Sequence, residues 1–294
     1  MTARELRTAP KVLPLYARAA APLVPGASHL PFVPGGGGEI PDLELRLSDA
    51  PVEPARVAAY AKVCGFTLRD TVPATYPHVL AFPLHMALMA DGRFPFGAIG
   101  LVHVGNRIEQ RRPVRIGEPL SLRVRASGLE PHPRGRTFSI LTEALVGDEP
   151  VWEETSTILR RGGGGGADGA PAPAAAKAAE HEPLPASAEW HLPGDLGRRY
   201  AAVSGDRNPI HMHALTAKAL GFPRAIAHGM WTKARCLAAL EPRLPAAYSV
   251  DVRFRRPLLL PGTVEFGSSA ADGAIDFFVR GAEPHLDGRV EPAS

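Results

Sequence analysis

Several short stretches of the chain alternate hydrophobic and polar residues with a period of two, the pattern of a half-buried β-strand. In residues 249–256, for example, Val250, Val252 and Phe254 fall on one face and charged residues fall on the other. The predicted strands span residues 42–48, 120–127, 137–146, 151–161, 188–192, 249–256, 263–270 and 274–280.

Helical patterns lie between these strands in a repeated order. A short helix is predicted at residues 54–65 and again at 194–205, and each is followed by a longer apolar helix, at 83–91 and at 230–240. Each half of the chain therefore runs strand, short helix, longer helix and then several strands. This order favours an α+β fold in which an antiparallel sheet wraps around one central helix.

The two halves also share sequence. YAKVCG at 60–65 matches YAAVSG at 200–205, and RRPVRIGEPL at 111–120 matches RRPLLLPGTV at 255–264. Matches at a nearly constant spacing indicate a duplicated domain. Two such units can join their sheets edge to edge, which hides the edges that a sheet must otherwise protect. We therefore expect an intrachain pseudo-dimer. The sequence does not determine whether two chains associate further into a homodimer.

A change in composition separates the halves. Residues 162–180 read GGGGGADGAPAPAAAKAAE, a sequence of small residues and prolines that cannot bury a core. We predict a linker there and divide the chain accordingly. The predicted parts are an N-terminal extension that packs on the first domain (1–39), a first domain (40–161), the linker (162–184) and a second domain (185–294).

Charge and cysteine content exclude several classes of protein. The chain carries 33 Lys and Arg against 30 Asp and Glu, a net charge of +3, and shows no concentrated basic block, so we expect no nucleic-acid partner. The sequence has no apolar run of the length of a membrane-spanning helix, and we expect no membrane insertion. Cys64 and Cys236 lie far apart without a CxxC pattern, which favours reduced thiols and a cytoplasmic protein.

The candidate chemistry lies between Tyr200 and Met230. Asn208 followed by proline is typical of a helix start, and the predicted helix runs over about 209–220. Asp206 then lies in the turn before the helix, and His211 lies in its first turn. A carboxylate and an imidazole five residues apart can converge on a space that holds one water molecule.

A second feature follows in the sequence IAHGM at 226–230. Gly229 is predicted at the N-terminus of the longer helix, where free N–H groups and the helix dipole stabilise a developing oxyanion. We expect His228 to be a packed core residue that supports Gly229, and Ser204 to support the preceding turn. His211 and His213 do not share a helix face, so we predict no metal site and a surface position for His213.

These residues resemble a known motif. YAAVSGDRNPIH, followed by ALGFPRAIAHGM, is similar to the hydratase 2 motif of MaoC-like dehydratases, the (R)-specific enoyl-CoA hydratases. The whole chain resembles the double-hot-dog members of this family, particularly actinobacterial 3-hydroxyacyl-thioester dehydratases. The resemblance implies a double hot-dog fold and a hydro-lyase of fatty acid metabolism that hydrates trans-2-enoyl thioesters reversibly to (R)-3-hydroxyacyl thioesters.

The resemblance also implies roles for individual residues. Asp206 and His211 would hold and activate the water, Asn208 would support the turn, and the Gly229 N–H would bind the thioester oxygen. The substrate would be carried on CoA or acyl carrier protein, without a further cofactor. A hot-dog acyl-CoA thioesterase and a non-catalytic acyl-thioester-binding subunit are the alternatives.

The first half lacks the acid–base pair. Aligned on the shared motifs, Phe66 falls opposite Asp206 and Thr71 opposite His211, while His85 falls opposite Gly229 and Met86 opposite Met230. We therefore expect one active site for each chain, built on the second half. The apolar stretch YPHVLAFPLHMALM at 76–89 is expected to line an acyl tunnel.

Overall fold

The structure is a computed structural model that describes residues 2–20, 38–162 and 185–293. Over these ranges the strands form one eleven-stranded sheet in the order β1-β2-β4-β5-β6-β3-β8-β11-β10-β9-β7. The strands are β1 (Thr2–Leu6), β2 (Leu43–Ala50), β3 (Val102–Gln110), β4 (Leu120–His132), β5 (Gly135–Val146), β6 (Glu149–Arg161), β7 (Ala188–Leu192), β8 (Tyr248–Phe254), β9 (Gly262–Ala271), β10 (Ala274–Arg280) and β11 (Pro284–Pro292).

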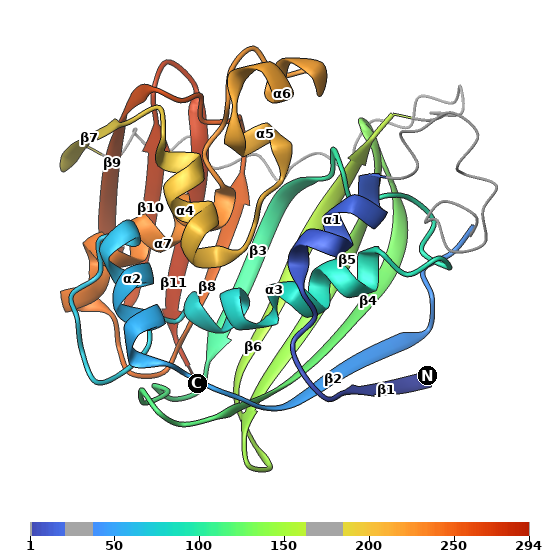
Figure 1. Cartoon of the computed structure of the whole chain (residues 1–294). Helices are drawn as coiled ribbons and strands as arrows, with labels where there is room; N and C mark the ends of the chain where they lie inside the picture. Colours follow the sequence, from blue (N-terminus) through green and yellow to red (C-terminus); the bar gives the residue numbers. More distant parts are fainter. Residues whose placement is uncertain (1, 21–37, 163–184, 294) are drawn as a thin grey trace.

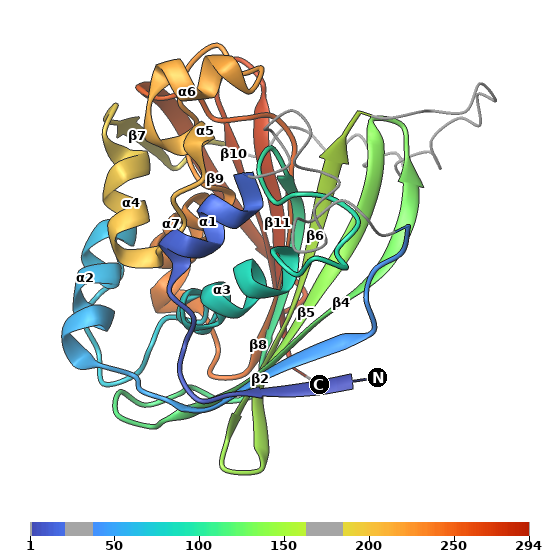
Figure 2. The same ribbon diagram turned by 45° about the vertical axis from the view of Figure 1, so that its right-hand side comes forward.

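The helices gather on one side of this sheet, with the long helices α3 and α7 packed under the shorter ones (Figures 1 and 2). The α-helices are α1 (Val12–Ala20), α2 (Pro54–Cys64), α3 (Tyr76–Met89), α4 (Leu196–Ser204), α5 (Pro209–Met212), α6 (Ala214–Ala219) and α7 (Gly229–Leu240). A sheet wrapped around two central helices is the predicted α+β double hot-dog fold. Among the helices of the described residues, none is long and apolar enough to cross a membrane.

The two halves meet strand to strand. β2 to β6 are contiguous in the sheet order, β7 to β11 are contiguous, and β3 pairs antiparallel with β8 through pairs such as Ile108 and Val250. The predicted edge-to-edge joining of the sheets is therefore observed, and each half repeats the same order of elements. The domain limits themselves stay a prediction, and the predicted linker lies outside the described residues except for Gly162.

The alternating pattern identified the strands well. In β8, Val250 and Val252 are buried while Asp251 and Arg253 are exposed, as their spacing predicts. Three strands were missed, β1, β3 and β11. β3 was not predicted because the hydrophobic pattern of VHVGNRIEQ is interrupted by Gly105 and by Asn106, whose side chain is buried.

The helix boundaries correct two predictions. α3 begins at Tyr76 and contains Pro83, which the sequence pattern placed at a helix start because proline suits that position. Met86 therefore lies near the end of α3, whereas Met230 is the second residue of α7. The alignment of Met86 with Met230, and of His85 with Gly229, is wrong.

The second correction concerns the helix predicted at 209–220. It is broken into α5 and α6 by His213, whose backbone is extended. The break has a local cause, because the carbonyl of Ile210 accepts a hydrogen bond from the Ile226 N–H (3.1 Å). That carbonyl is therefore directed toward a neighbouring segment, and the helix does not continue.

A buried lysine lies across the seam between the halves. Lys233 of α7 is completely buried, and its Nζ donates to the Asn106 carbonyl (3.1 Å) on β3 and to the Val250 carbonyl (3.1 Å) on β8. A third bond reaches Asn106 Oδ1 (2.5 Å), and the Asn106 amide in turn donates to Glu154 (2.6 Å). Burial lowers the pKa of Lys233 to about 7, and the negative charge of Glu154 opposes this effect. When the amine is protonated, its three N–H donors meet three acceptors.

Replacing this lysine should destabilise the whole protein. We expect K233M to lower the free energy of unfolding by about 3–5 kcal/mol, because the two seam carbonyls and Asn106 Oδ1 lose their buried donor and Glu154 loses a nearby positive charge. Urea unfolding followed by circular dichroism measures the change. The matched control is K62M on the exposed side of α2, and a K233M midpoint equal to that of K62M would contradict the role of Lys233.

Candidate active site

The turn between α4 and α5 is fixed by short-range hydrogen bonds. α4 ends at Ser204, and Gly205 adopts the left-handed conformation (φ 78°) that reverses the chain. The Ser204 hydroxyl then accepts from the Asp206 N–H (3.2 Å), and the Asn208 side chain accepts from the Ile210 N–H (3.4 Å). Asn208 is therefore the predicted N-cap, and Ser204 supports the turn.

The two carboxylate oxygens of Asp206 differ in their surroundings. Oδ1 accepts from the Tyr16 hydroxyl (2.7 Å) and from the Asn208 N–H (3.0 Å). Oδ2 lies 3.8 Å from His228 Nε2. Burial raises the pKa of Asp206, but the neighbouring His228 and His211 and these hydrogen bonds outweigh burial, so the pKa lies below its usual range. Asp206 is ionised at neutral pH.

His211 lies in the one-turn helix α5, as predicted, and is buried. Its Nδ1 lies 2.8 Å from the Ile226 carbonyl, which can only accept, so Nδ1 carries the proton. The lone pair of Nε2 is then available. Burial lowers the pKa of His211 below 6.5, and Asp206 opposes this effect only in part. A neutral imidazole with a free Nε2 is suited to accept a proton.

His228 is more than the packed core residue that was expected. It is buried, as predicted, but its ring stacks on His211 with the ring centroids 3.7 Å apart, and its Nε2 donates to the Asp206 carbonyl (3.0 Å). Burial lowers the pKa of His228 to about 3, which keeps it neutral. His228 thus ties the start of α7 to the turn that carries Asp206, whereas His213 is exposed.

Gly229 is the first residue of α7 and lines the same cavity. The N–H groups in the first turn of a helix have no partner within the helix, so they are available to an anionic group. A Cβ atom at this position would lie 3.0 Å from the ring of Phe254. The absence of a side chain therefore lets the Phe254 ring, which also lines the cavity, pack closely against the start of α7.

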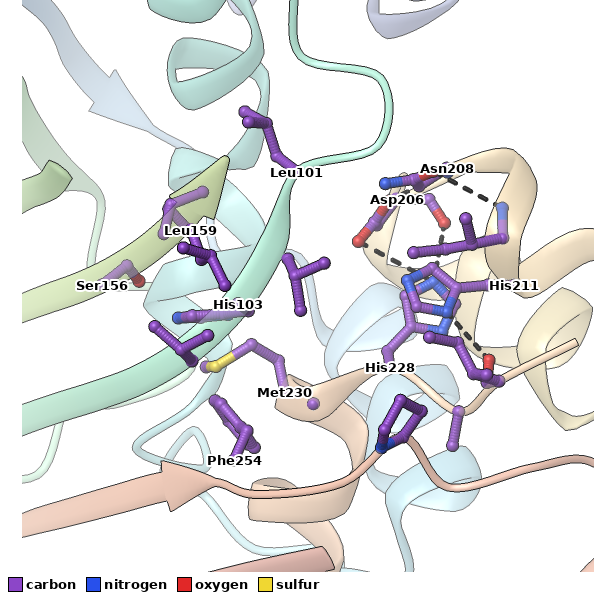
Figure 3. Close-up of a pocket in the computed structure, with 18 of the residues that line it drawn as sticks. Leu101, His103, Ser156, Leu159, Asp206, Asn208, His211, His228, Met230 and Phe254 are labelled. Carbon is purple, nitrogen blue, oxygen red and sulfur yellow. Dashed lines mark hydrogen bonds and ion pairs between the residues drawn. The ribbon is translucent and has the colours of Figure 1, made fainter. Parts of the chain in front are cut away.

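The cavity has a volume of about 210 Å³ and is lined by both halves. Figure 3 shows Leu101, His103 and Leu159 of the first half facing Asp206 and His211 of the second. From the predicted stretch 76–89, five residues line the cavity: His78, Phe82, His85, Met86 and Met89. Four arginines also line it: Arg134, Arg161, Arg255 and Arg256.

The first half contributes a buried polar cluster that the sequence reading missed. His78 Nδ1 lies 2.9 Å from both oxygens of Glu154, and His85 Nε2 lies 2.8 Å from the Thr142 hydroxyl. His78, His85 and Glu154 offer donor atoms within 4.8 Å of one another, as do Asp206, His211 and His228, so either set could hold a cation. The absence of a metal cofactor stays a prediction.

Two further residues of the site were missed. A Cβ atom on Gly197 of α4 would lie 2.0 Å from the His211 carbonyl, so only glycine allows α4 and α5 to approach this closely. The other residue is Tyr16, which reaches Asp206 across 190 positions of sequence. No local pattern marks either residue.

Comparison with known proteins agrees with this architecture. Residues 176–277 match the family model described as "MaoC like domain". The chain is 40% identical over 267 residues to 3-hydroxyacyl-thioester dehydratase X of Mycobacterium tuberculosis, covering 90% of this chain and 94% of the relative. A crystal structure of that protein superposes with a TM-score of 0.75 at 37% identity, covering 85% of this chain and all of the other.

A more distant structure extends the fold comparison. Another Mycobacterium tuberculosis protein, described as having a double hotdog fold, gives a TM-score of 0.54 at 16% identity, covering 87% of this chain and 98% of that one. The fold and these relatives define a double hot-dog hydro-lyase. The chain belongs to the MaoC-like dehydratase family.

The hydrogen bonds at the site predict the tautomers of its two histidines. At pH 7 we expect His211 to be neutral with its proton on Nδ1, and His228 to be neutral with its proton on Nε2. Since burial disfavours the charged form, His211 should take up a second proton only as the pH falls below 6.5. Nitrogen-15 NMR of labelled histidine measures both states, with signals assigned from H211N and H228N. A charged His211 at pH 7 would refute this reading.

Proposed function

We propose that the protein catalyses the reversible hydration of trans-2-enoyl thioesters to (R)-3-hydroxyacyl thioesters. The supporting observation is the pairing of a buried neutral histidine with an ionised aspartate at one cavity, where each keeps one atom without a hydrogen-bonded partner among the described residues. His211 Nε2 and Asp206 Oδ2 are those atoms. The (R) configuration is an expectation that rests on the resemblance to hydratase 2 enzymes.

The reaction follows from this pair. A water molecule held between Asp206 Oδ2 and His211 Nε2 transfers a proton to Nε2 while its oxygen bonds to C3 of the enoyl group. The electrons move to the thioester oxygen, which becomes an enolate. The imidazolium, stabilised by the Asp206 carboxylate, then returns the proton to C2. One water molecule is added, and the enzyme regains its starting protonation state.

The start of α7 supports the enolate in this proposal. The Gly229 N–H and the dipole of α7 would stabilise the negative oxygen in a cavity that excludes most water. His228 beside Gly229 is neutral, so it adds no positive charge next to His211. The stabilisation of the negative thioester oxygen in this proposal comes from the Gly229 N–H and the dipole of α7.

The cavity walls suggest how the substrate binds. The aliphatic and aromatic side chains from the first half suit an acyl chain, and Phe82, Met86 and Met89 extend along one helix. Arg134 and Arg256 line the same cavity and suit the phosphate groups of CoA or of the pantetheine arm of acyl carrier protein. We place the reaction in cytoplasmic fatty acid metabolism, in an intrachain pseudo-dimer that needs no cofactor.

One assay distinguishes this function from the alternatives. Trans-2-enoyl-CoA substrates of increasing chain length are mixed with the purified protein, and loss of the conjugated enoyl absorbance is followed together with release of free CoA. Hydration without CoA release is the expected result. CoA release would favour a thioesterase, and binding without turnover at any chain length would favour a non-catalytic subunit.

Substitution of either member of the pair should abolish hydration. We expect D206N and H211A each to lower kcat by about 100-fold or more, because each removes the acceptor of a proton or of the water hydrogen bond. The controls are D195N and H213A, which change an exposed aspartate and an exposed histidine of the same segment. Rates in D206N or H211A equal to those of the controls would remove the proposed mechanism.

Crowding the start of α7 should slow the same step. In G229A the new methyl group meets the Phe254 ring at 3.0 Å, so either this wall of the cavity or the start of α7 must shift, and we expect kcat to fall by about 10- to 100-fold. Steady-state hydration kinetics measure the effect. G194A is the matched control, because a Cβ at Gly194 meets Pro261 at an ordinary 3.6 Å. Equal kcat in the two variants would contradict the role given to Gly229.

A further inference from the structure

The N-terminal segment reaches the second half of the chain. β1 pairs in parallel with β2, and α1 packs against α3, so residues 2–20 lie on the first half as predicted. Figure 1 shows α1 crossing above α3 toward the turn between α4 and α5. At that turn a Cβ on Gly205 would lie 3.9 Å from the side chain of Val12. α1 therefore contacts the segment that carries Asp206.

The hydroxyl of Tyr16 makes two hydrogen bonds there. It accepts from the Arg207 N–H (2.9 Å) and lies 2.7 Å from Asp206 Oδ1. Since the backbone N–H can only donate, the hydroxyl proton is left for the carboxylate. The direction of the Tyr16–Asp206 hydrogen bond is thus fixed by the neighbouring backbone. Tyr16 also lines the cavity itself.

This donor determines which oxygen of Asp206 remains available. Oδ1 receives two short hydrogen bonds, one from Tyr16 and one from the Asn208 N–H at 3.0 Å. No hydrogen bond to Oδ2 comes from the part of the chain that the structure describes, and His228 Nε2 lies 3.8 Å from it. Two donors on one oxygen hold the plane of the carboxylate and keep the other oxygen directed at the histidine pair.

We propose that Tyr16 is a positioning residue of the active site, which holds Asp206 ionised and turns its Oδ2 toward the water-binding position. This inference rests on the proposed hydratase function. It assigns a chemical task to the N-terminal segment, which acts through Asp206 on a reaction carried out by residues of the second half.

A purely structural role would have different consequences. If the hydroxyl only fastened α1 to the turn, its removal would lower stability and leave the chemistry of Asp206 unchanged. A donor to a charged carboxylate favours the charged form, so its loss makes protonation of Asp206 easier. The protonation of Asp206 therefore distinguishes the two roles.

The first test is the variant Y16F, which removes the hydroxyl and keeps the ring. We expect kcat for hydration to fall roughly 10- to 100-fold with little change in KM, as suits a hydrogen bond to a charged group. Y60F is the matched control, because it removes a buried tyrosine hydroxyl that bonds to Thr75 and does not contact Asp206.

The second test does not require turnover. Carbon-13 NMR of labelled aspartate follows the ionisation of Asp206 with pH, with its signal identified by its absence in D206N. In Y16F the midpoint should lie at higher pH than in the wild type and in Y60F. If the wild type does not hydrate enoyl thioesters, the proposed function fails, and this titration alone decides the role of Tyr16.

The remaining outcomes are equally decisive. A raised Asp206 midpoint in Y16F supports the inference, with or without measurable turnover. An unchanged midpoint overturns it, whatever the rates of Y16F and Y60F.

Discussion

One buried ammonium group sets the geometry on which the rest of the structure depends. Lys233 projects from the central helix of the second half and bonds to carbonyls on both sides of the seam between β3 and β8. Because these bonds are short and directional, they fix α7 relative to the sheet at the place where the halves join. The cavity lies between α3, α7 and this part of the sheet, so its shape depends on that contact. The charge is tolerated because Asn106 links it to Glu154.

The two halves use buried histidines and carboxylates in opposite ways. In the first half, His78 and Glu154 bond to each other, His85 bonds to Thr142, and Asn106 completes the set. In the second half, Asp206 uses Oδ1 and His211 uses Nδ1 for hydrogen bonds to the protein. Both residues line the cavity. Similar side chains thus form a hydrogen-bonded network in the first half, whereas in the second half Asp206 Oδ2 and His211 Nε2 have no such partner among the described residues. The difference lies in which atoms remain unsatisfied.

The sequence predicted what short-range rules determine. Alternation placed β8 and its exposed Arg253, and the Asn208–Pro209 pair placed the start of α5, because side-chain spacing and capping act within a few residues. The predictions from the sequence were wrong where contacts between distant parts of the chain override local preference. Pro83 lies inside α3 because burial on nearly every side of that helix outweighs one lost backbone hydrogen bond. Asn106 is buried because its side chain accepts a hydrogen bond from Lys233, and Tyr16 bonds to Asp206 across 190 positions of sequence. Neither contact can be predicted from a local pattern.

The long separation between Tyr16 and Asp206 has a consequence for how the protein is made. A chain is synthesised from its N-terminus, so Tyr16 leaves the ribosome 190 residues before the carboxylate that accepts its hydrogen bond. The first half can assemble its strands and its network while α1 still lacks this acceptor. The contact can close only after residues up to Asp206 have been made, when the whole first half has already left the ribosome. The hydrogen bond between Tyr16 and Asp206 therefore joins the start of the chain to a segment that is synthesised after the first half is complete.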